Sequence, residues 1–265
     1  MKKSVLFISI TFMLIACKSE FEKVRTSNNP EILYKKALEY YDNEDWVKAQ
    51  TLLELSIPNY RGKAEAEELF IKFAYTHYYN NEFILSAHYF KSFSTTFYNS
   101  DKKEEAEFMS AYSNYRMSPN PRLDQTYTEK AIEGLQIFVN TFPRSERVAE
   151  CNQLIDEMRL KLERKALLQG ELYYNIGQYE AAVKSFSTML NDFPDAEQGE
   201  KVRYLMLKAT YEFAKKSIFG KKLERFEEAK LLYNKFIKKH PTSKYSDEVK
   251  DIYSNTVEEL KKLKA

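Results

Sequence analysis

Cys17 is the residue whose surroundings most clearly specify a chemical reaction. Two lysines open the chain, and an apolar run over 5–15 follows, too short to cross a bilayer as a helix of roughly 20 apolar residues. A charged start, a short apolar segment and a small residue, Ala16, before Cys17 are typical of a signal peptide over 1–16. The ending Leu-Ile-Ala-Cys resembles the bacterial lipobox, which predicts cleavage before Cys17 and attachment of diacylglycerol to its thiol.

The acylated cysteine is expected to act as a membrane anchor. The new N-terminus of such chains often takes a further N-acyl chain, and two or three acyl chains anchor a protein stably where one does not. Lys18 stands where an Asp favours retention in the inner membrane, so the outer membrane is expected. The polar residues 17–29 predict a flexible tether. The alternative is an ordinary secreted protein with a cysteine at this point by chance.

The rest of the chain offers no constellation typical of an enzyme. It has no P-loop, no glycine-rich dinucleotide turn, no HExxH and no paired CxxC. We expect His77 and His240 to be packing residues, and His88 to lie on the surface or inside a hairpin. With Cys17 acylated, Cys151 is the remaining thiol, and its apolar neighbours favour a buried structural role over a reactive one. We predict no enzymatic activity, no metal and no cofactor beyond the covalent lipid.

The charge balance argues against a nucleic-acid partner. Residues 1–16 contain two lysines and no acid, so the mature chain has 39 Lys+Arg against 39 Asp+Glu. Nucleic-acid binding depends on a basic excess that neutralises phosphates. Gly (6) and Pro (7) are scarce, whereas Tyr (20) and Phe (18) are abundant, which suits long helices with large side chains between them.

A repeated pattern organises the chain after the tether. A small residue is followed by an aromatic one after three positions, a second small one after twelve and a large apolar one after sixteen. This is the pattern of tetratricopeptide (TPR) helical hairpins, in which the small residues lie where the two helices cross. The three clearest copies are Ala37, Tyr40, Ala49 and Leu53; Ala74, His77, Ser86 and Phe90; and Gly170, Tyr173, Ala182 and Phe186.

The pattern predicts an all-α fold, an α-solenoid of about five TPR hairpins with a C-terminal capping helix over 243–263. The third and fifth hairpins need connections about eight residues longer, around Ser118–Pro121 and Phe219–Lys222. Residues 144–176 are expected to form one long helix. We divide the chain into hairpins one to three over 30–143, and hairpins four and five plus the capping helix over 144–265. The approximate hairpin spans are 31–60, 63–98, 101–142, 146–194 and 197–240.

Tyrosines dominate the positions expected to face the groove of the N-terminal hairpins. In TPR superhelices these positions are three before the small residue of each first helix and one, four and five after it. They hold Tyr34, Leu38, Tyr41 and Asp42 in the first hairpin, Ile71, Tyr75, Tyr78 and Tyr79 in the second, and Phe108, Tyr112, Tyr115 and Arg116 in the third. Because aromatics dominate binding hot spots, we predict binding of an extended peptide rich in aromatic and apolar side chains. The alternative is that these side chains pack against the next hairpin.

The stretch Ser118–Gln125, which reads SPNPRLDQ, carries a family resemblance. A similar Ser-Pro-x-Pro-x-x-Asp-Gln stretch lies inside the third hairpin of the BamD family, the TPR lipoprotein subunits of the outer-membrane β-barrel assembly machinery. Gln136-x-Phe138 and Phe142–Ser145 also resemble that family. With the lipobox, the tether and the hairpins, the resemblance covers essentially the whole chain. One departure is Tyr98, which stands where the second hairpin would end in proline.

The resemblance implies a lipid-anchored protein on the periplasmic face of the outer membrane. Its C-terminal repeats would bind the POTRA domains of the barrel-forming assembly subunit. Its N-terminal repeats would receive unfolded outer-membrane proteins, whose signals end in an aromatic residue, and promote their folding and insertion.

Two other functions stay open at this point. One is a periplasmic TPR scaffold lipoprotein for cell-envelope or cell-wall complexes, a class that usually has an N-terminal coiled coil. The other is a glycan-binding TPR lipoprotein of a nutrient-import complex, a class that is usually about twice as long and rich in tryptophan. Trp46 is the single tryptophan here, and the tether is too short for a coiled coil.

Overall fold

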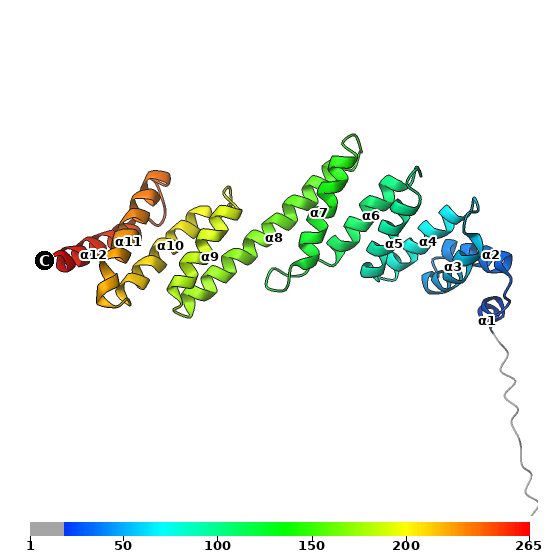
Figure 1. The fold of residues 1–265 in the computed structure, drawn as a ribbon, viewed down its shortest axis with the longest axis horizontal. Helices are drawn as coiled ribbons and strands as arrows, with labels where there is room; N and C mark the ends of the chain where they lie inside the picture. Colours follow the sequence, from blue (N-terminus) through cyan, green and yellow to red (C-terminus); the bar gives the residue numbers. More distant parts are fainter. Residues whose placement is uncertain (1–18) are drawn as a thin grey trace, which may run out of the picture. The chain divides into compact units, whose positions relative to one another are not determined.

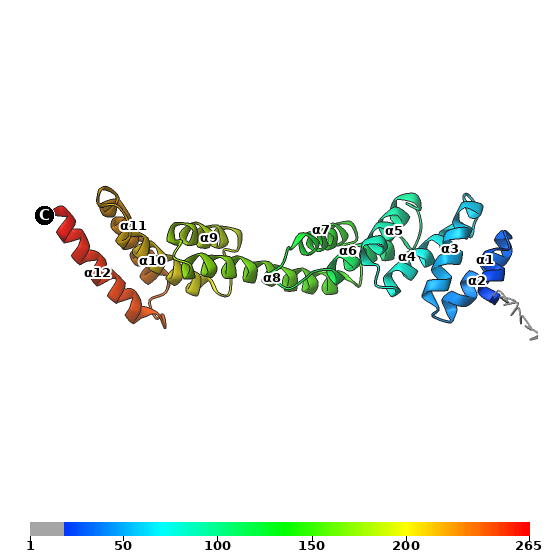
Figure 2. The same cartoon turned by 90° about the horizontal axis from the view of Figure 1, so that it is seen from below.

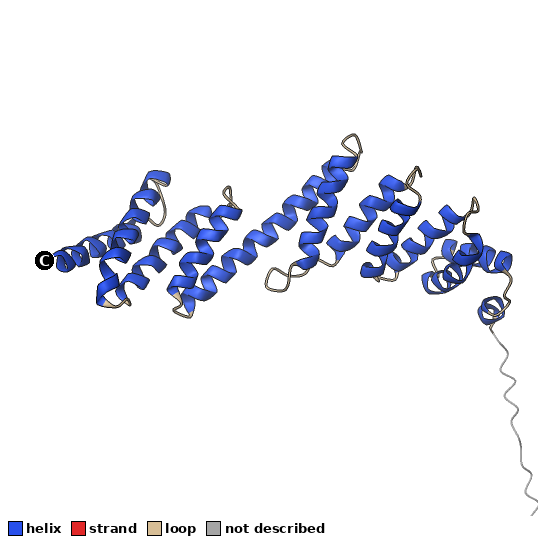
Figure 3. Ribbon diagram, viewed as in Figure 1, coloured by secondary structure: helices blue, strands red, loops and turns tan. Residues whose placement is uncertain are grey.

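The computed structural model describes residues 19–265, and this part consists of helices joined by short loops, without a strand (Figure 1; Figure 3). The chain divides into two compact units, Met1–Arg116 and Met117–Ala265. The described helices of the first unit are α1 (Glu20–Arg25), α2 (Pro30–Asp42), α3 (Trp46–Tyr60), α4 (Ala66–Tyr79), α5 (Phe83–Thr96) and α6 (Lys103–Arg116). Those of the second are α7 (Thr126–Thr141), α8 (Val148–Asn175), α9 (Tyr179–Asp192), α10 (Gly199–Lys215), α11 (Phe219–Lys239) and α12 (Ser246–Lys264).

Each helix of the first unit packs against the next one in the chain, as in a TPR-like solenoid. The α2–α3 and α4–α5 pairs form the first two predicted hairpins. Their small residues, Ala37, Ala49, Ala74 and Ser86, have no exposed surface, because they lie where the helices cross. The all-α fold of TPR-like hairpins is thereby confirmed.

The expected flexible tether is partly helical, and this prediction was wrong for residues 20–25. The Ser19 hydroxyl caps α1 by accepting a hydrogen bond from the Glu22 amide at 3.2 Å. The Phe21 ring packs edge-on against Tyr40 at 5.9 Å, and Val24 is buried in the core of the first unit. Composition predicted a linker because these few apolar side chains are surrounded by charged ones. Cys17 and the signal peptide lie outside the described residues.

The second unit is built around α8, the long helix predicted over 144–176. Its 28 residues pack against α7 along one half and against α9 along the other (Figure 1; Figure 2). α8 and α9 lie close together at Gly170, since a Cβ added there would lie 2.3 Å from Cε1 of Phe186. The capping helix is also confirmed as α12, which buries Val249 and Ile252 against Ala229 and Phe236.

The two long connections differ in kind. Residues 117–125 between α6 and α7 form a loop, as predicted, and the boundary of the two units falls at its start rather than after Pro143. The helices α6 and α7 of the expected third hairpin therefore belong to different units. The connection predicted around Phe219–Lys222 is not a loop, because α11 begins at Phe219 and only three residues separate it from α10. None of the described helices is long and apolar enough to span a membrane.

Candidate functional site

A continuous series of aromatic rings crosses the first unit from α2 to α6. We call it the aromatic run. It starts at Tyr41, whose ring lies 5.1 Å from that of Trp46 at the start of α3. Trp46 stacks on Tyr79 of α4 at 4.2 Å, and Tyr79 contacts Tyr75 at 5.8 Å and Tyr78 at 5.7 Å. Tyr78 then contacts Tyr112 of α6 at 6.3 Å, and Tyr112 contacts Tyr115 at 5.4 Å. Six of the predicted groove tyrosines are thus brought together.

Tyr75 ties α4 to α6. Its hydroxyl donates a hydrogen bond to a carboxylate oxygen of Glu105, and its ring packs edge-on against the buried Phe90 at 4.8 Å. Burial, and then Glu105, raise the pKa of Tyr75 above its ordinary value, so the phenol stays protonated and remains a donor. Tyr75 therefore packs between hairpins, which is the alternative that the sequence left open for the groove tyrosines.

Tyr34 has the same arrangement one hairpin earlier and lies apart from the aromatic run. Its hydroxyl donates to Glu68 of α4 at 3.3 Å, and its ring lies 4.9 Å from that of Tyr60. Burial, followed by Glu68, raises its pKa to about 12. Leu38 is half-buried on α2. Ile71 was predicted to line the groove, and this was wrong, because it is only 4% exposed and belongs to the core side of α4.

The accessible part of the aromatic run lies at Tyr79 and Arg116. Tyr79 keeps 42% of its surface exposed, and Arg116 is exposed at the end of α6. The guanidinium of Arg116 donates to the Tyr78 hydroxyl at 2.7 Å and lies 4.6 Å from the ring centroid of Phe83. No carboxylate of residues 19–265 forms an ion pair with it. Arg116 is therefore a positive charge held on aromatic rings and available to a ligand carboxylate.

Sequence reasoning missed Trp46 and Glu105. The groove rule considers first helices alone, whereas Trp46 opens a second helix and reaches the aromatic run from there. The sequence did contain a signal for Trp46, the single tryptophan of the chain. Because it follows Tyr41 by five residues and begins the next helix, it has to lie near the end of α2. Glu105 lies in the charged stretch Lys103–Glu105, and nothing in the sequence distinguishes it from its neighbours. Its role depends on the distance between α4 and α6, which the sequence does not provide.

The stretch that carries the family resemblance organises a loop of the second unit. The amide nitrogen of Gln125 donates to the carbonyl oxygens of Asn120 at 2.9 Å and Leu123 at 3.1 Å, and its side-chain oxygen accepts from Thr128 at 2.7 Å. The Asp124 carboxylate accepts from the Thr126 amide at 2.9 Å at the start of α7. Hydrogen bonds from Thr126 hold the pKa of Asp124 below its usual value. The motif is thus a loop-closing and helix-capping device.

Further hydrogen bonds from α8 fasten the same loop. Lys161 donates to the Ser118 hydroxyl at 2.7 Å, and Lys165 donates to the carbonyl oxygen of Leu123 at 2.6 Å.

Elsewhere in residues 19–265, no three or more His, Cys, Asp or Glu side chains are arranged to hold a metal. His77 is buried, and Nδ1 lies 2.7 Å from the Gln50 amide nitrogen and 2.5 Å from a Glu82 oxygen. Burial lowers the pKa of His240, which favours its neutral form. Cys151 is fully buried, as predicted, and burial raises the pKa of its thiol to about 11.

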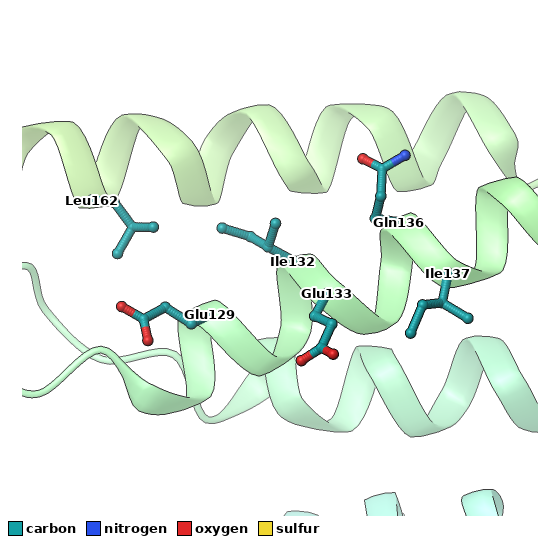
Figure 4. Close-up of a pocket in the computed structure, with 6 residues that line it drawn as sticks. All are labelled: Glu129, Ile132, Glu133, Gln136, Ile137 and Leu162. Atoms are coloured by element: carbon teal, nitrogen blue, oxygen red, sulfur yellow. The ribbon is translucent and has the colours of Figure 1, made fainter. Parts of the chain in front are cut away.

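The hollows of the described surface are shallow and mainly apolar. One, of about 400 Å³, lies between α7 and α8, where Leu162 reaches from α8 towards Ile132 of α7 (Figure 4). Glu129 and Glu133 stand at its edge (Figure 4). A second, of about 600 Å³, lies in the first unit between Tyr60, Phe70 and Phe97, with Arg61 and Lys63 beside it.

Comparisons with known proteins agree with the family resemblance. A family model described as YfiO, outer membrane lipoprotein, matches residues 26–222, and a tetratricopeptide repeat model matches residues 218–243. A curated protein of Aquifex aeolicus (strain VF5), provisionally named outer membrane protein assembly factor BamD, is 27% identical over 203 residues. The match covers 74% of this chain and 64% of that relative, which is less than two thirds of its length.

Among solved structures, a yeast histone chaperone, Hif1, described as a scaffold protein that recruits protein complexes to core histones, aligns with 93% of this chain and 98% of its own. The TM-score of 0.29 and the sequence identity of 16% are too low for this likeness to inform function.

Proposed function

Since the chain belongs to the YfiO family of outer membrane lipoproteins, we propose that it is a non-enzymatic component of the machinery that assembles outer-membrane proteins. Acylated Cys17 anchors it in the outer membrane, with the helical units on the periplasmic face. The first unit binds unfolded β-barrel precursors through the aromatic run. The second unit binds the POTRA domains of the barrel-forming subunit, and the two contacts together promote folding and insertion.

The observation that carries this proposal is the aromatic run with Arg116 at its end. Tyrosine offers a large rigid apolar area with a polar tip, so it can bind many different sequences without a fixed hydrogen-bond pattern. Unfolded barrel strands alternate apolar and polar side chains and have to be bound without strong sequence preference. A cation on the rings adds a contact for a carboxylate of the bound chain.

Substitution of Tyr79 and Arg116 distinguishes a peptide-binding role of the aromatic run from a packing role. Tyr75 is unsuitable, because removing it breaks its hydrogen bond to Glu105 and opens space beside Phe90. The variant Tyr79→Ala with Arg116→Ala removes two exposed side chains that are not among the buried core residues. It should weaken binding of a labelled peptide, the C-terminal strand of an outer-membrane barrel protein, by about tenfold, measured by fluorescence anisotropy.

The matched control for this experiment is Tyr98→Ala. Tyr98 is 66% exposed in the same unit but lies outside the aromatic run. The Tyr98→Ala variant should bind the peptide with the same affinity as the unsubstituted chain. Equal affinity of all three proteins would assign the aromatic run to packing and refute its role as the substrate surface.

The partner of the second unit is tested with the lipidated full-length chain. Affinity purification from detergent-solubilised membranes should recover a POTRA-bearing barrel protein. Recovery of cell-wall enzymes without a barrel protein would contradict the assembly function and favour the envelope scaffold instead.

A further inference from the structure

The junction between α10 and α11 exposes two large apolar side chains side by side. Ile218 is 76% exposed and Phe219 is 78% exposed, more than any other large apolar side chain of the described residues. Both lie at the end of the α10–α11 hairpin, where three residues connect the two helices (Figure 1). The neighbouring Ala214 and Phe226 are fully buried in the core, whereas Ile218 and Phe219 remain exposed to solvent.

The residues around this pair form a basic surface, which we call the basic tip and define as residues 212–225. It contains five basic and two acidic residues, a formal charge of +3 in a mature chain that is neutral as a whole. Lys215 pairs with Glu212 at 3.1 Å, and Lys221 pairs with Glu224 at 2.9 Å. These four side chains cancel each other. The excess comes from the three remaining ones, Lys216, Lys222 and Arg225.

Within residues 19–265, none of the three excess cations lies at ion-pair distance from a carboxylate. Lys216 lies 4.7 Å from the ring centroid of Tyr179, and Arg225 lies over the Phe213 ring at 3.7 Å and donates to the Ser217 hydroxyl at 2.5 Å. The pKa of Glu259 is lowered mainly by the hydrogen bond from Lys262, its partner at 2.8 Å, and to a smaller degree by the charge of Lys222. The basic tip therefore presents net positive charge around an apolar point.

This combination fits a bilayer better than a protein partner. Cores of protein interfaces are depleted in lysine and need a broad complementary surface, which two side chains at a hairpin end do not offer. Interfacial membrane anchors combine a few exposed apolar side chains with Lys and Arg. The apolar groups enter the boundary of the acyl region, and the long basic side chains extend to the headgroups. Electrostatic attraction to anionic lipids acts within about 10 Å at 0.1 M salt.

We propose that the basic tip is a second membrane contact, in which Phe219 and Ile218 insert into the interface of a bilayer containing anionic lipids. This contact is separate from the lipid on Cys17 and from the aromatic run. It gives the second unit its own attachment to the membrane surface.

The test places a fluorophore at the tip. The full-length chain with Phe219→Trp is added to vesicles of brominated phosphatidylcholine with or without phosphatidylglycerol. Its additional indole emission, after subtraction of the Trp46 signal of the unsubstituted chain, should be quenched in vesicles with phosphatidylglycerol, and the quenching should be lost at about 1 M salt, where the Debye length is near 3 Å. A chain with Leu160→Trp, at a site that is 55% exposed on α8, should show no such quenching.

A second pair of variants tests whether the lysines of the basic tip are needed for the membrane contact. Adding Lys216→Gln and Lys222→Gln to the Phe219→Trp chain should remove most of the quenching. Adding Lys238→Gln and Lys239→Gln, at the opposite end of α11, removes the same charge and should leave it unchanged. Equal quenching of the Phe219→Trp and Leu160→Trp chains, or equal effects of the two lysine pairs, would overturn the proposal. So would protection of the tip by a protein of the assembly complex without any quenching in vesicles.

Discussion

At Gly170 the packing of the second unit leaves no room for a side chain. A methyl group there would lie 2.3 Å from Cε1 of the fully buried Phe186 ring, so the ring or a helix would have to shift. Gly170→Ala should therefore lower the free energy of unfolding by about 1–3 kcal/mol, despite the gain of roughly 1 kcal/mol in helix propensity. Urea denaturation followed by circular dichroism measures the change.

The control for this prediction is Gly220→Ala. A Cβ at Gly220, also in a helix, has nothing within 4 Å, so this substitution should be neutral or stabilising. Equal effects of the two substitutions would show that the α8–α9 contact at Gly170 is looser than described.

Because Cys151 is buried, we expect the protein to lose stability at alkaline pH. Burial, and then Glu150, raise the pKa of its thiol from an ordinary 9.0 to about 11. The folded chain therefore holds the proton more tightly than the unfolded chain, and this contribution is complete below pH 9 and is lost as the pH rises towards 11. The free energy of unfolding should fall over this range, and Cys151→Ala should reduce the fall. A thiol reagent at pH 8 should modify Cys151 only after denaturation, and rapid modification of the native chain would contradict its burial.

At the scale of single residues, the sequence identified the side chains of the site better than their roles. The TPR register correctly brought Tyr41, Tyr75 and Tyr79 to one region. It could not distinguish a tyrosine bonded to the next hairpin from an exposed one, because that depends on where residues about thirty positions later lie. Ile71 was misassigned for a related reason, since a one-residue difference in helix rotation turns a side chain from groove to core.

At the scale of elements, the loop 117–125 should depend on one amide side chain. Gln125 is 3% exposed and satisfies two carbonyl oxygens and the Thr128 hydroxyl. Gln125→Ala removes these three hydrogen bonds, whereas each partner keeps one other bond, and the loss of three net contributions should cost about 1–3 kcal/mol. It should also speed limited proteolysis within 117–125. Unchanged cleavage would mean that Lys161 and Lys165 hold the loop without it. Arg122→Ala, which truncates an exposed side chain of the same loop, serves as the control.

The repeat pattern predicted most of the helices and their order, but it did not predict the start of α11 or the presence of α1. The chain beyond Lys215 contains a glycine and polar residues, which favour a loop, yet these residues begin α11, because the buried Phe226 and Ala229 further along fix that helix against α10. Likewise α1 is short and charged, and packing against Tyr40 and the core adds to its Ser19 cap to stabilise it as a helix. In both cases tertiary contacts override local propensity.

At the scale of the whole molecule, Cys17 should decide where the protein resides. Cys17→Ser removes the acceptor thiol, so the chain should lose its lipid and move from the membrane fraction to the soluble periplasmic fraction. The measurement is fractionation together with mass spectrometry of the mature N-terminus. Full retention of Cys17→Ser in the outer membrane at high salt would contradict an acyl anchor.

Helix α1 has a consequence for the effective concentration of anything embedded in the membrane. A fully extended tether over 17–29 would let the first unit reach roughly 40 Å from its lipid, whereas the residues between Cys17 and Glu20 reach about 10 Å. Because the effective concentration of tethered groups falls as about the −3/2 power of tether length, shortening the tether from about twelve residues to about three should concentrate a membrane-embedded partner around the first unit roughly eightfold. The packing of Phe21 against Tyr40 would therefore hold the first unit closer to the acyl anchor that we propose at Cys17.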